Sequence, residues 1–200
     1  MALNYFLLSA IEWICLSLFV LVSEKLICGE MRKRNFRFPS WLPYAVNEVG
    51  TAIIFLIYGF TPQTFCGIAL LMILLFASVQ DDSTHEADNV LSLMIFLLGL
   101  STVTEENILS KLLAAGLVFG IQLFVCLFCK KAGIGGADIK LSTATVFLLG
   151  LWKGLLGLML GMLIAIVAEL ILCRKNNKKS TEPFPLIPYL SVGFIIGYII

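Results

Sequence analysis

Two acidic clusters, each beside an apolar run, contain the side chains of this chain that are best suited to chemistry. Asp81 and Asp82 come at the end of one apolar run, and Asp138 lies in a glycine-rich stretch between two others. A carboxylate at the edge of a membrane segment is costly unless it has a task or a partner. Two carboxylates in a partly dry site share a proton, so one can act as a base towards water while the other acts as an acid towards a carbonyl. Such a pair cleaves a peptide bond without a covalent nucleophile, and we expect neither a metal nor a cofactor.

Other reaction classes fit the residues less well. The chain has one histidine, His85, so a His-rich zinc site is excluded and a Ser-His-Asp triad would depend on that single residue. The sequence has neither a P-loop nor a GxGxxG motif at a place where a strand would lead into a helix. The net charge of +1 and the lack of a basic stripe with interleaved aromatic residues predict no nucleic-acid partner.

The composition indicates an all-α integral membrane protein. Hydrophobic residues make up 60% of the chain and charged residues 14%, and the mean hydropathy is +0.99. A soluble domain of this size would need more polar surface than these residues provide. We expect about eight transmembrane helices in one membrane domain over residues 1–200, with a first helix and basic loop over 1–40 and the core over 41–200.

The expected helices follow the apolar runs. The run 141–173 is too long for one helix across a hydrocarbon core of about 30 Å, which needs about 20 residues, so we expect a break at Trp152-Lys153-Gly154. The basic loop is expected over 23–40. The predicted spans are 5–22, 41–60, 64–79, 90–103, 108–129, 141–152, a seventh that ends at 173, and 184–200.

Lysines and arginines indicate the orientation, because short cytoplasmic loops carry an excess of them. When the loops after the first, third, fifth and seventh spans are cytoplasmic, every Lys and Arg except Lys111 and Lys153 lies on that side. Both acidic clusters then face the cytoplasm, and the N-terminus lies outside. This orientation requires that the short fourth and sixth segments cross the membrane.

Small residues at four-residue spacing predict close packing between helices, since lipid gives helices no hydrophobic reason to associate. The pairs with this spacing are Gly116 and Gly120, Gly150 and Gly154, Gly157 and Gly161, and Gly193 and Gly197.

The stretch from Gly133 to Leu141, and within it Gly135-Gly136-Ala137-Asp138-Ile139-Lys140-Leu141, resembles the GxGD-x-KL signature of the type IV prepilin peptidases. These are membrane aspartic proteases, and they include the archaeal preflagellin peptidases. In that family the first catalytic Asp ends a span, and an Asn or Asp follows it after eight positions. Asp81 and Asn89 have this separation.

Two further segments extend the resemblance over about residues 41–200. The segment from Pro43 to Thr51, which includes Glu48, looks like the family's Tyr-Pro-x-x-Glu-x-x-Thr. The segment from Pro183 to Leu190 resembles its closing Pro-Phe-Gly-Pro-x-Leu.

The chain departs from the family pattern in three ways. Ala137 replaces the last glycine of GxGD, and alanine tolerates positive φ less well than glycine, so the turn could be reshaped. Ala87-Asp88 replaces the usual Ile-Pro and adds a carboxylate. The cysteine-rich domain that methylates the new N-terminus has no counterpart, so the resemblance implies the peptidase alone, as in the single-domain Tad and preflagellin-like members.

The resemblance implies roles for particular residues. Asp81 and Asp138 match the catalytic pair, and Asp82, Glu86 and Asp88 are the alternatives to Asp81 as the first acid. The supporting residues are Gly133, Gly135, Gly136, Ala137, Lys140, Asn89 and Glu48. For Lys140 two readings stay open: a contact with phosphate headgroups or a carboxylate that holds the Asp138 loop, or an ordinary cytoplasmic anchor.

Charges near the first acid suggest a contact with substrate. Asp82, Glu86 and Asp88 could attract a basic leader through local electrostatics. If the segment after Asp81 continues as a helix, His85 and Asp88 share a face with it and His85 could tune the pair; the alternative is a solvated loop histidine.

Taken together, these patterns predict an aspartic endopeptidase in a prokaryotic plasma membrane. The resemblance implies that it crosses the membrane several times and removes a short basic leader from prepilin-like precursors at the cytoplasmic face. Its partners would be that substrate and the lipid bilayer, and its oligomeric state is open. Two alternatives are an ion-coupled transporter, which requires acids near the midplane and an internal repeat, and an inactive scaffold for pilus assembly, in which Asp138 is dispensable.

Overall fold

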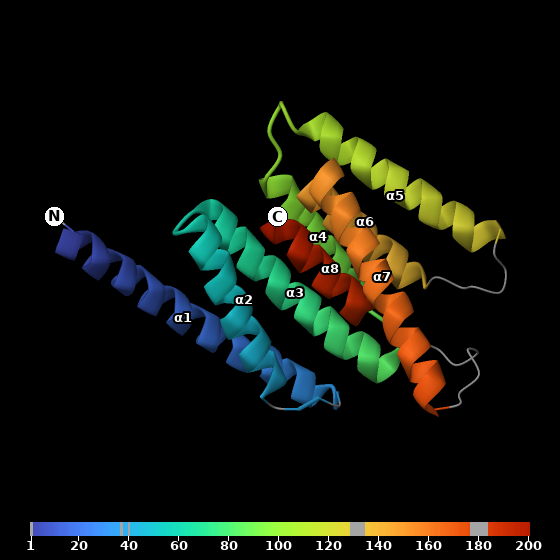
Figure 1. Ribbon diagram of the computed structural model, residues 1–200, viewed down its shortest axis with the longest axis horizontal. Helices are drawn as coiled ribbons and strands as arrows, with labels where there is room; N and C mark the ends of the chain where they lie inside the picture. Colours follow the sequence, from blue (N-terminus) through green and yellow to red (C-terminus); the bar gives the residue numbers. More distant parts are fainter. Residues whose placement is uncertain (1, 37, 40, 129–134, 177–183) are drawn as a thin grey trace. The chain divides into compact units, whose positions relative to one another are not determined.

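The computed structural model describes residues 2–36, 38–39, 41–128, 135–176 and 184–200. In this part of the chain every regular element is an α-helix (Figure 1), so the all-α class is confirmed. The helices are α1 (Ala2–Lys33), α2 (Leu42–Tyr58), α3 (Pro62–Thr84), α4 (Asn89–Ser101), α5 (Ile108–Phe128), α6 (Gly136–Leu149), α7 (Leu151–Asn176) and α8 (Ile187–Ile199).

Three of the described helices are long and apolar enough to cross a membrane, namely α3, α5 and α7. The apolar helices α2, α4 and α8 are shorter. The chain therefore has the helices of a membrane protein. Eight separate crossings, and the orientation derived from them, stay predictions.

The first helix is longer than its apolar run. α1 continues to Lys33, so the prediction of a loop from residue 23 is wrong for residues 23–33. Val20, Glu24 and Cys28 are buried at four-residue intervals, because one face of the helix stays packed after the apolar run ends. The basic residues Arg32 and Lys33 lie in its last turn.

The break in the long apolar run lies at Gly150 rather than at Trp152-Lys153-Gly154. Gly150 has a φ of 82°, which glycine adopts without the steric cost of a Cβ. Its N–H donates to the carbonyl of Val146 and closes α6. The predicted break residues are instead part of the first turn of α7.

The helices form two compact units, residues 1–72 and 73–200. The first unit contains α1, α2 and the first half of α3. Its core holds Leu16, Val20, Ile68 and Met72, and Phe55 packs against them. The prediction of a single domain over the whole chain stays a prediction.

The second unit contains the rest of α3 and α4 to α8, with α6 packed against α4, α5, α7 and α8. Glycines allow α7 and α8 to approach backbone to backbone. A Cβ added to Gly193 would meet the carbonyl of Gly157 and the backbone of Gly161, which confirms the close packing predicted for these pairs. No described atom lies within 4 Å of a Cβ added to Gly116 or Gly120, so that pair was wrongly assigned to a helix contact.

Candidate active site

Asp138 is held at the start of α6 by the backbone that precedes it. It is the third residue of the helix, and its Oδ2 accepts the N–H of Gly135 at 3.2 Å. A carboxylate in the first turn also interacts favourably with the positive end of the helix dipole. A Cβ on Gly135 would lie 3.0 Å from that oxygen, so glycine leaves the space in which the carboxylate folds back.

Ala137 causes no strain in this turn. It lies inside α6 and is not among the described non-glycine residues with positive φ, which are Asn35 and His85. The turn before α6 is described only from Gly135, so its reshaping by Ala137 stays a prediction. Gly133, and Ile134 beside it, lie outside the described residues.

Asp81 lies in the last turn of α3 and is 6% exposed. Its Oδ2 accepts the backbone N–H of Ile187 at 3.0 Å. Ile187 is the first residue of α8 and Pro188 the second, so the carboxylate is placed at a helix N-terminus, where unpaired N–H groups favour a negative charge. The closing proline segment had been assigned no role from the sequence, although a proline in a first turn is typical of a helix start.

A polar contact between α3 and α8 lies one turn from this hydrogen bond. Ser78 Oγ donates to Ser191 Oγ at 2.9 Å, and Ser191 Oγ also lies 2.8 Å from the carbonyl of Ile187. These contacts fix the register of the two helices, and with it the distance from Asp81 to the start of α8.

The charge of Asp81 acts on Asp138. Burial and, after it, the negative charge of Asp81 raise the pKa of the Asp138 carboxyl to about 6, and the Gly135 N–H acts in the opposite direction. Asp138 lies in the first turn of α6, outside the three helices long enough to span a membrane. At neutral pH a fraction of Asp138 is protonated, and a protonated carboxyl can give a proton to a substrate.

The acidic residues after Asp81 are largely in contact with solvent. Asp82 and Glu86 are exposed, and Asp88 is half-buried just before α4. Among these acids Asp81 is therefore the buried one.

The predicted shared face of Asp81, His85 and Asp88 is wrong, because α3 ends at Thr84. His85 has a φ of 53°, which turns the chain out of the helix. The His85 side chain is exposed.

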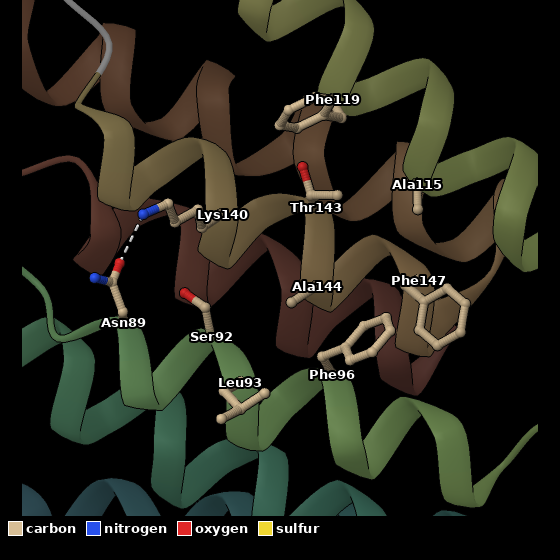
Figure 2. A pocket seen from close by; sticks show the side chains of 10 residues that line it. All are labelled: Asn89, Ser92, Leu93, Phe96, Ala115, Phe119, Lys140, Thr143, Ala144 and Phe147. Carbon is tan, nitrogen blue, oxygen red and sulfur yellow. Dashed lines mark hydrogen bonds between the residues drawn. The ribbon is translucent and has the colours of Figure 1, made fainter.

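Asn89 and Lys140 connect α4, the helix after Asp81, to α6, the helix that carries Asp138. Lys140 Nζ donates to Asn89 Oδ1 at 2.9 Å (Figure 2). The partner is a neutral amide rather than a carboxylate. This bond joins the first residue of α4 to the second turn of α6, so the loop between Asp81 and Asn89 is tied to the helix of Asp138.

A pocket of about 340 Å³ begins at this bond and extends between α4, α5 and α6 (Figure 2). Asn89 and Lys140 form one end, and aromatic rings line the other. Neither Asp81 nor Asp138 lines it. Its residues are Asn89, Ser92, Leu93, Phe96, Ala115, Phe119, Lys140, Thr143, Ala144 and Phe147.

A second support for α6 was missed from the sequence. Ser142 Oγ lies 2.6 Å from the carbonyl of Asp138 and 2.8 Å from Oε1 of Gln122. Gln122 is a buried residue of α5. An isolated glutamine in an apolar helix is the signal that could have indicated this contact, since a buried amide needs a partner.

Glu48 belongs to α2 in the first unit and is half-buried. Among the described residues, no group of three or more His, Cys, Asp or Glu side chains is arranged to hold a metal ion.

Comparison with known proteins gives one match. The model of the type IV leader peptidase family matches residues 68–173, which is just over half of the chain and includes Asp81, Asn89 and Asp138. No curated protein and no solved structure matches the chain.

Proposed function

Since the chain belongs to the type IV leader peptidase family, whose members are proteases, we propose that it is a membrane aspartic endopeptidase. Its substrates are prepilin-like precursors, from which it removes a short basic leader at the cytoplasmic face of a prokaryotic plasma membrane. Asp81 and Asp138 are the proposed acid-base pair.

The observation that carries this proposal is the coupling of the two carboxylates. Each accepts a backbone N–H from a different segment, Gly135 for Asp138 and Ile187 for Asp81. The charge of Asp81 nevertheless acts on Asp138. Two acids in one partly buried place, with different hydrogen-bond partners, are expected to differ in proton affinity, which is the property that assigns acid and base roles.

In the proposed reaction, ionised Asp81 takes a proton from a water molecule, and the water oxygen attacks the carbonyl carbon of the scissile peptide. Protonated Asp138 gives its proton to the carbonyl oxygen. The tetrahedral intermediate then collapses, Asp138 regains a proton from the hydroxyl group, and Asp81 gives its proton to the leaving nitrogen as the C–N bond breaks. The Ile187 N–H supports the ionised starting form of Asp81, since a hydrogen bond to a charged group favours the charged form.

The charges beside Asp81 support the proposed substrate class. Asp82, Glu86 and Asp88 stand at the end of α3 and in the loop that follows, where a basic leader would meet negative charge. The precursor's apolar helix would lie in the bilayer, and the scissile bond would be at its cytoplasmic end.

The two alternative functions receive no support from specific contacts. A scaffold was suggested by Ala137, but this residue sits in a regular helix turn. A transporter requires acids near the middle of the membrane, whereas Asp81 lies in the last turn of one helix and Asp138 in the first turn of another.

The experiment that tests the function uses the purified full-length protein in lipid nanodiscs with a prepilin-like precursor. Mass spectrometry of both products should find a single cut on the C-terminal side of the basic leader. Failure to cleave any of several precursors with basic leaders, under conditions where the protein is folded, would contradict the proposed function.

A further inference from the structure

Four polar side chains form a buried cluster in the first unit. Glu24 comes from α1, and Asn47, Glu48 and Thr51 come from α2. Glu24 is 0% exposed, and Asn47 and Thr51 are each 1% exposed. Glu48 is half-buried. We call these four residues the Glu24 cluster.

Helix periodicity brings the cluster together. Glu24 is on the buried face of α1 with Val20 and Cys28, and Asn47 and Thr51 are one turn apart on the buried face of α2. The two helices pack against each other (Figure 1). The Asn47 amide faces the Glu24 carboxyl at close range, and the charge of Glu48 also acts on that carboxyl.

Six polar atoms of the cluster are buried without a hydrogen bond of ordinary geometry. Both carboxylate oxygens of Glu24 and both polar atoms of the Asn47 amide are buried without a partner, and so are Oε1 of Glu48 and Oγ1 of Thr51. Native proteins satisfy the great majority of buried polar atoms, so a group of unpaired atoms in one place indicates a bound species between them. Five of these six atoms are oxygens, so the cluster offers many more acceptors than donors.

The charge of the cluster indicates whether the species bound there is a cation or a water molecule. Glu24 and Glu48 bring two carboxylates, and no described lysine or arginine bonds their buried oxygens. The ion pair described in this unit, Lys33 with Glu30, is at the exposed end of α1. Water supplies no charge, so either protons or a cation must neutralise the two carboxylates. Two carboxylates beside an amide oxygen and a hydroxyl oxygen favour the cation.

We propose that the Glu24 cluster binds a hard metal cation of the alkali or alkaline-earth class between α1 and α2. Carboxylate, amide and hydroxyl oxygens are the ligands that such cations prefer. The cluster contains two carboxylates and has no sulfur or imidazole among its unpaired atoms, which distinguishes it from a transition-metal site. The bound cation joins α1 to α2 and stabilises the first unit.

The test measures thermal unfolding of the full-length protein in nanodiscs at constant ionic strength. Choline chloride is replaced in turn by the chlorides of sodium, potassium, magnesium and calcium. We expect one of these cations to raise Tm saturably over choline. The same cation, radiolabelled, should bind at one equivalent per chain in equilibrium dialysis.

Three variants localise the effect. Glu24→Gln keeps the shape but removes a charge, and Thr51→Val keeps the shape but removes a ligand oxygen; both should lose the cation-dependent rise in Tm and the bound equivalent. Glu30→Gln, at an exposed position of the same helix, should retain both. Thr51→Val is decisive if Glu24→Gln does not fold.

Two results would overturn the proposal. One is a parent Tm that is the same in all five chlorides. If this Tm changes with pH alone, protons or water satisfy the cluster. The other is cation binding that is unchanged in Thr51→Val. Neither result bears on the peptidase, because none of these readouts uses cleavage.

Discussion

The carboxylate of Asp81 accepts a hydrogen bond from the backbone N–H of Ile187, across 3.0 Å and between helices that are more than 100 residues apart in the chain. The start of α8 therefore completes the environment of an acid at the end of α3. In our account this N–H keeps Asp81 ionised and in position to activate water.

Replacing Ile187 with proline tests this role, because proline has no N–H yet fits the first position of a helix. A hydrogen bond to a charged group contributes about 1.5–3 kcal/mol, so we expect kcat to fall by roughly 10- to 100-fold, at 1.4 kcal/mol for each factor of ten. The measurement is leader cleavage at saturating substrate.

The matched control is Ile187→Ala. The Ile187 side chain is fully buried, and both variants lose its packing, but only the proline variant loses the N–H. Equal kcat values for the two variants would show that packing, and not the hydrogen bond, supports Asp81.

The ionisation of Asp138 predicts a pH dependence of stability. Burial, and then the charge of Asp81, raise the pKa of Asp138 in the folded protein to about 6, from 3.8. Because the folded state holds the proton more tightly, the stabilising contribution is complete below the unfolded pKa and is lost as pH rises through the folded pKa. The Tm of the parent should therefore fall relative to that of Asp138→Asn between about pH 4 and pH 6.

The same titration in Asp81→Asn isolates the effect of the first acid. Removing its charge removes one of the causes that raise the pKa of Asp138, so the fall in Tm should move to lower pH. An unchanged midpoint would mean that the two carboxylates do not interact.

The bond between Lys140 and Asn89 predicts coupled effects on cleavage. It links the first residue of α4 with α6, and a hydrogen bond of this kind contributes about 0.5–1.5 kcal/mol. We expect Lys140→Met and Asn89→Ala each to lower kcat/KM by roughly two- to tenfold, with no additional loss in the double variant. Cleavage kinetics of the four proteins measure the coupling.

Ser92→Ala is the control for this cycle, because Ser92 lines the same pocket without taking part in the Lys140 bond. Fully additive losses would show that Lys140 and Asn89 act independently, as expected for a lysine that serves only as a cytoplasmic anchor.

The three acidic residues beside Asp81 predict an electrostatic contribution to substrate capture. Neutralising Asp82, Glu86 and Asp88 with Asn or Gln should raise KM and leave kcat nearly unchanged, because charges in contact with solvent act on encounter more than on chemistry. The increase in KM should shrink at high salt, where exposed charges are screened. A KM that is unchanged at low salt would remove these residues from leader recognition.

Local sequence patterns were sufficient to predict most of the helices and to predict that Asp81 and Asp138 lie at helix ends. Apolar runs predict where helices form, and the glycine-rich approach to Asp138 predicts a carboxylate at a helix start. The errors arose where a single backbone position decides the outcome, as at Gly150 and His85, whose positive φ values end helices. α1 was underestimated because its polar continuation still buries one face.

Contacts between distant segments could not be predicted from local patterns. The Ile187 N–H on Asp81 and the Gln122 amide near Ser142 join residues that are close only after the helices pack. A backbone donor has no sequence signature of its own, and an isolated glutamine indicates that a partner exists without indicating which one.

The central claim is that Asp81 and Asp138 act together on the peptide bond, and the most direct measurement is leader removal in membranes at equal expression. We expect Asp81→Asn and Asp138→Asn each to lower the cleavage rate by about 100-fold or more, the scale of acid-base catalysis. Asp82→Asn, the exposed neighbour, should cleave at close to the parent rate. Cleavage that persists in either of the first two variants would contradict the proposed pair.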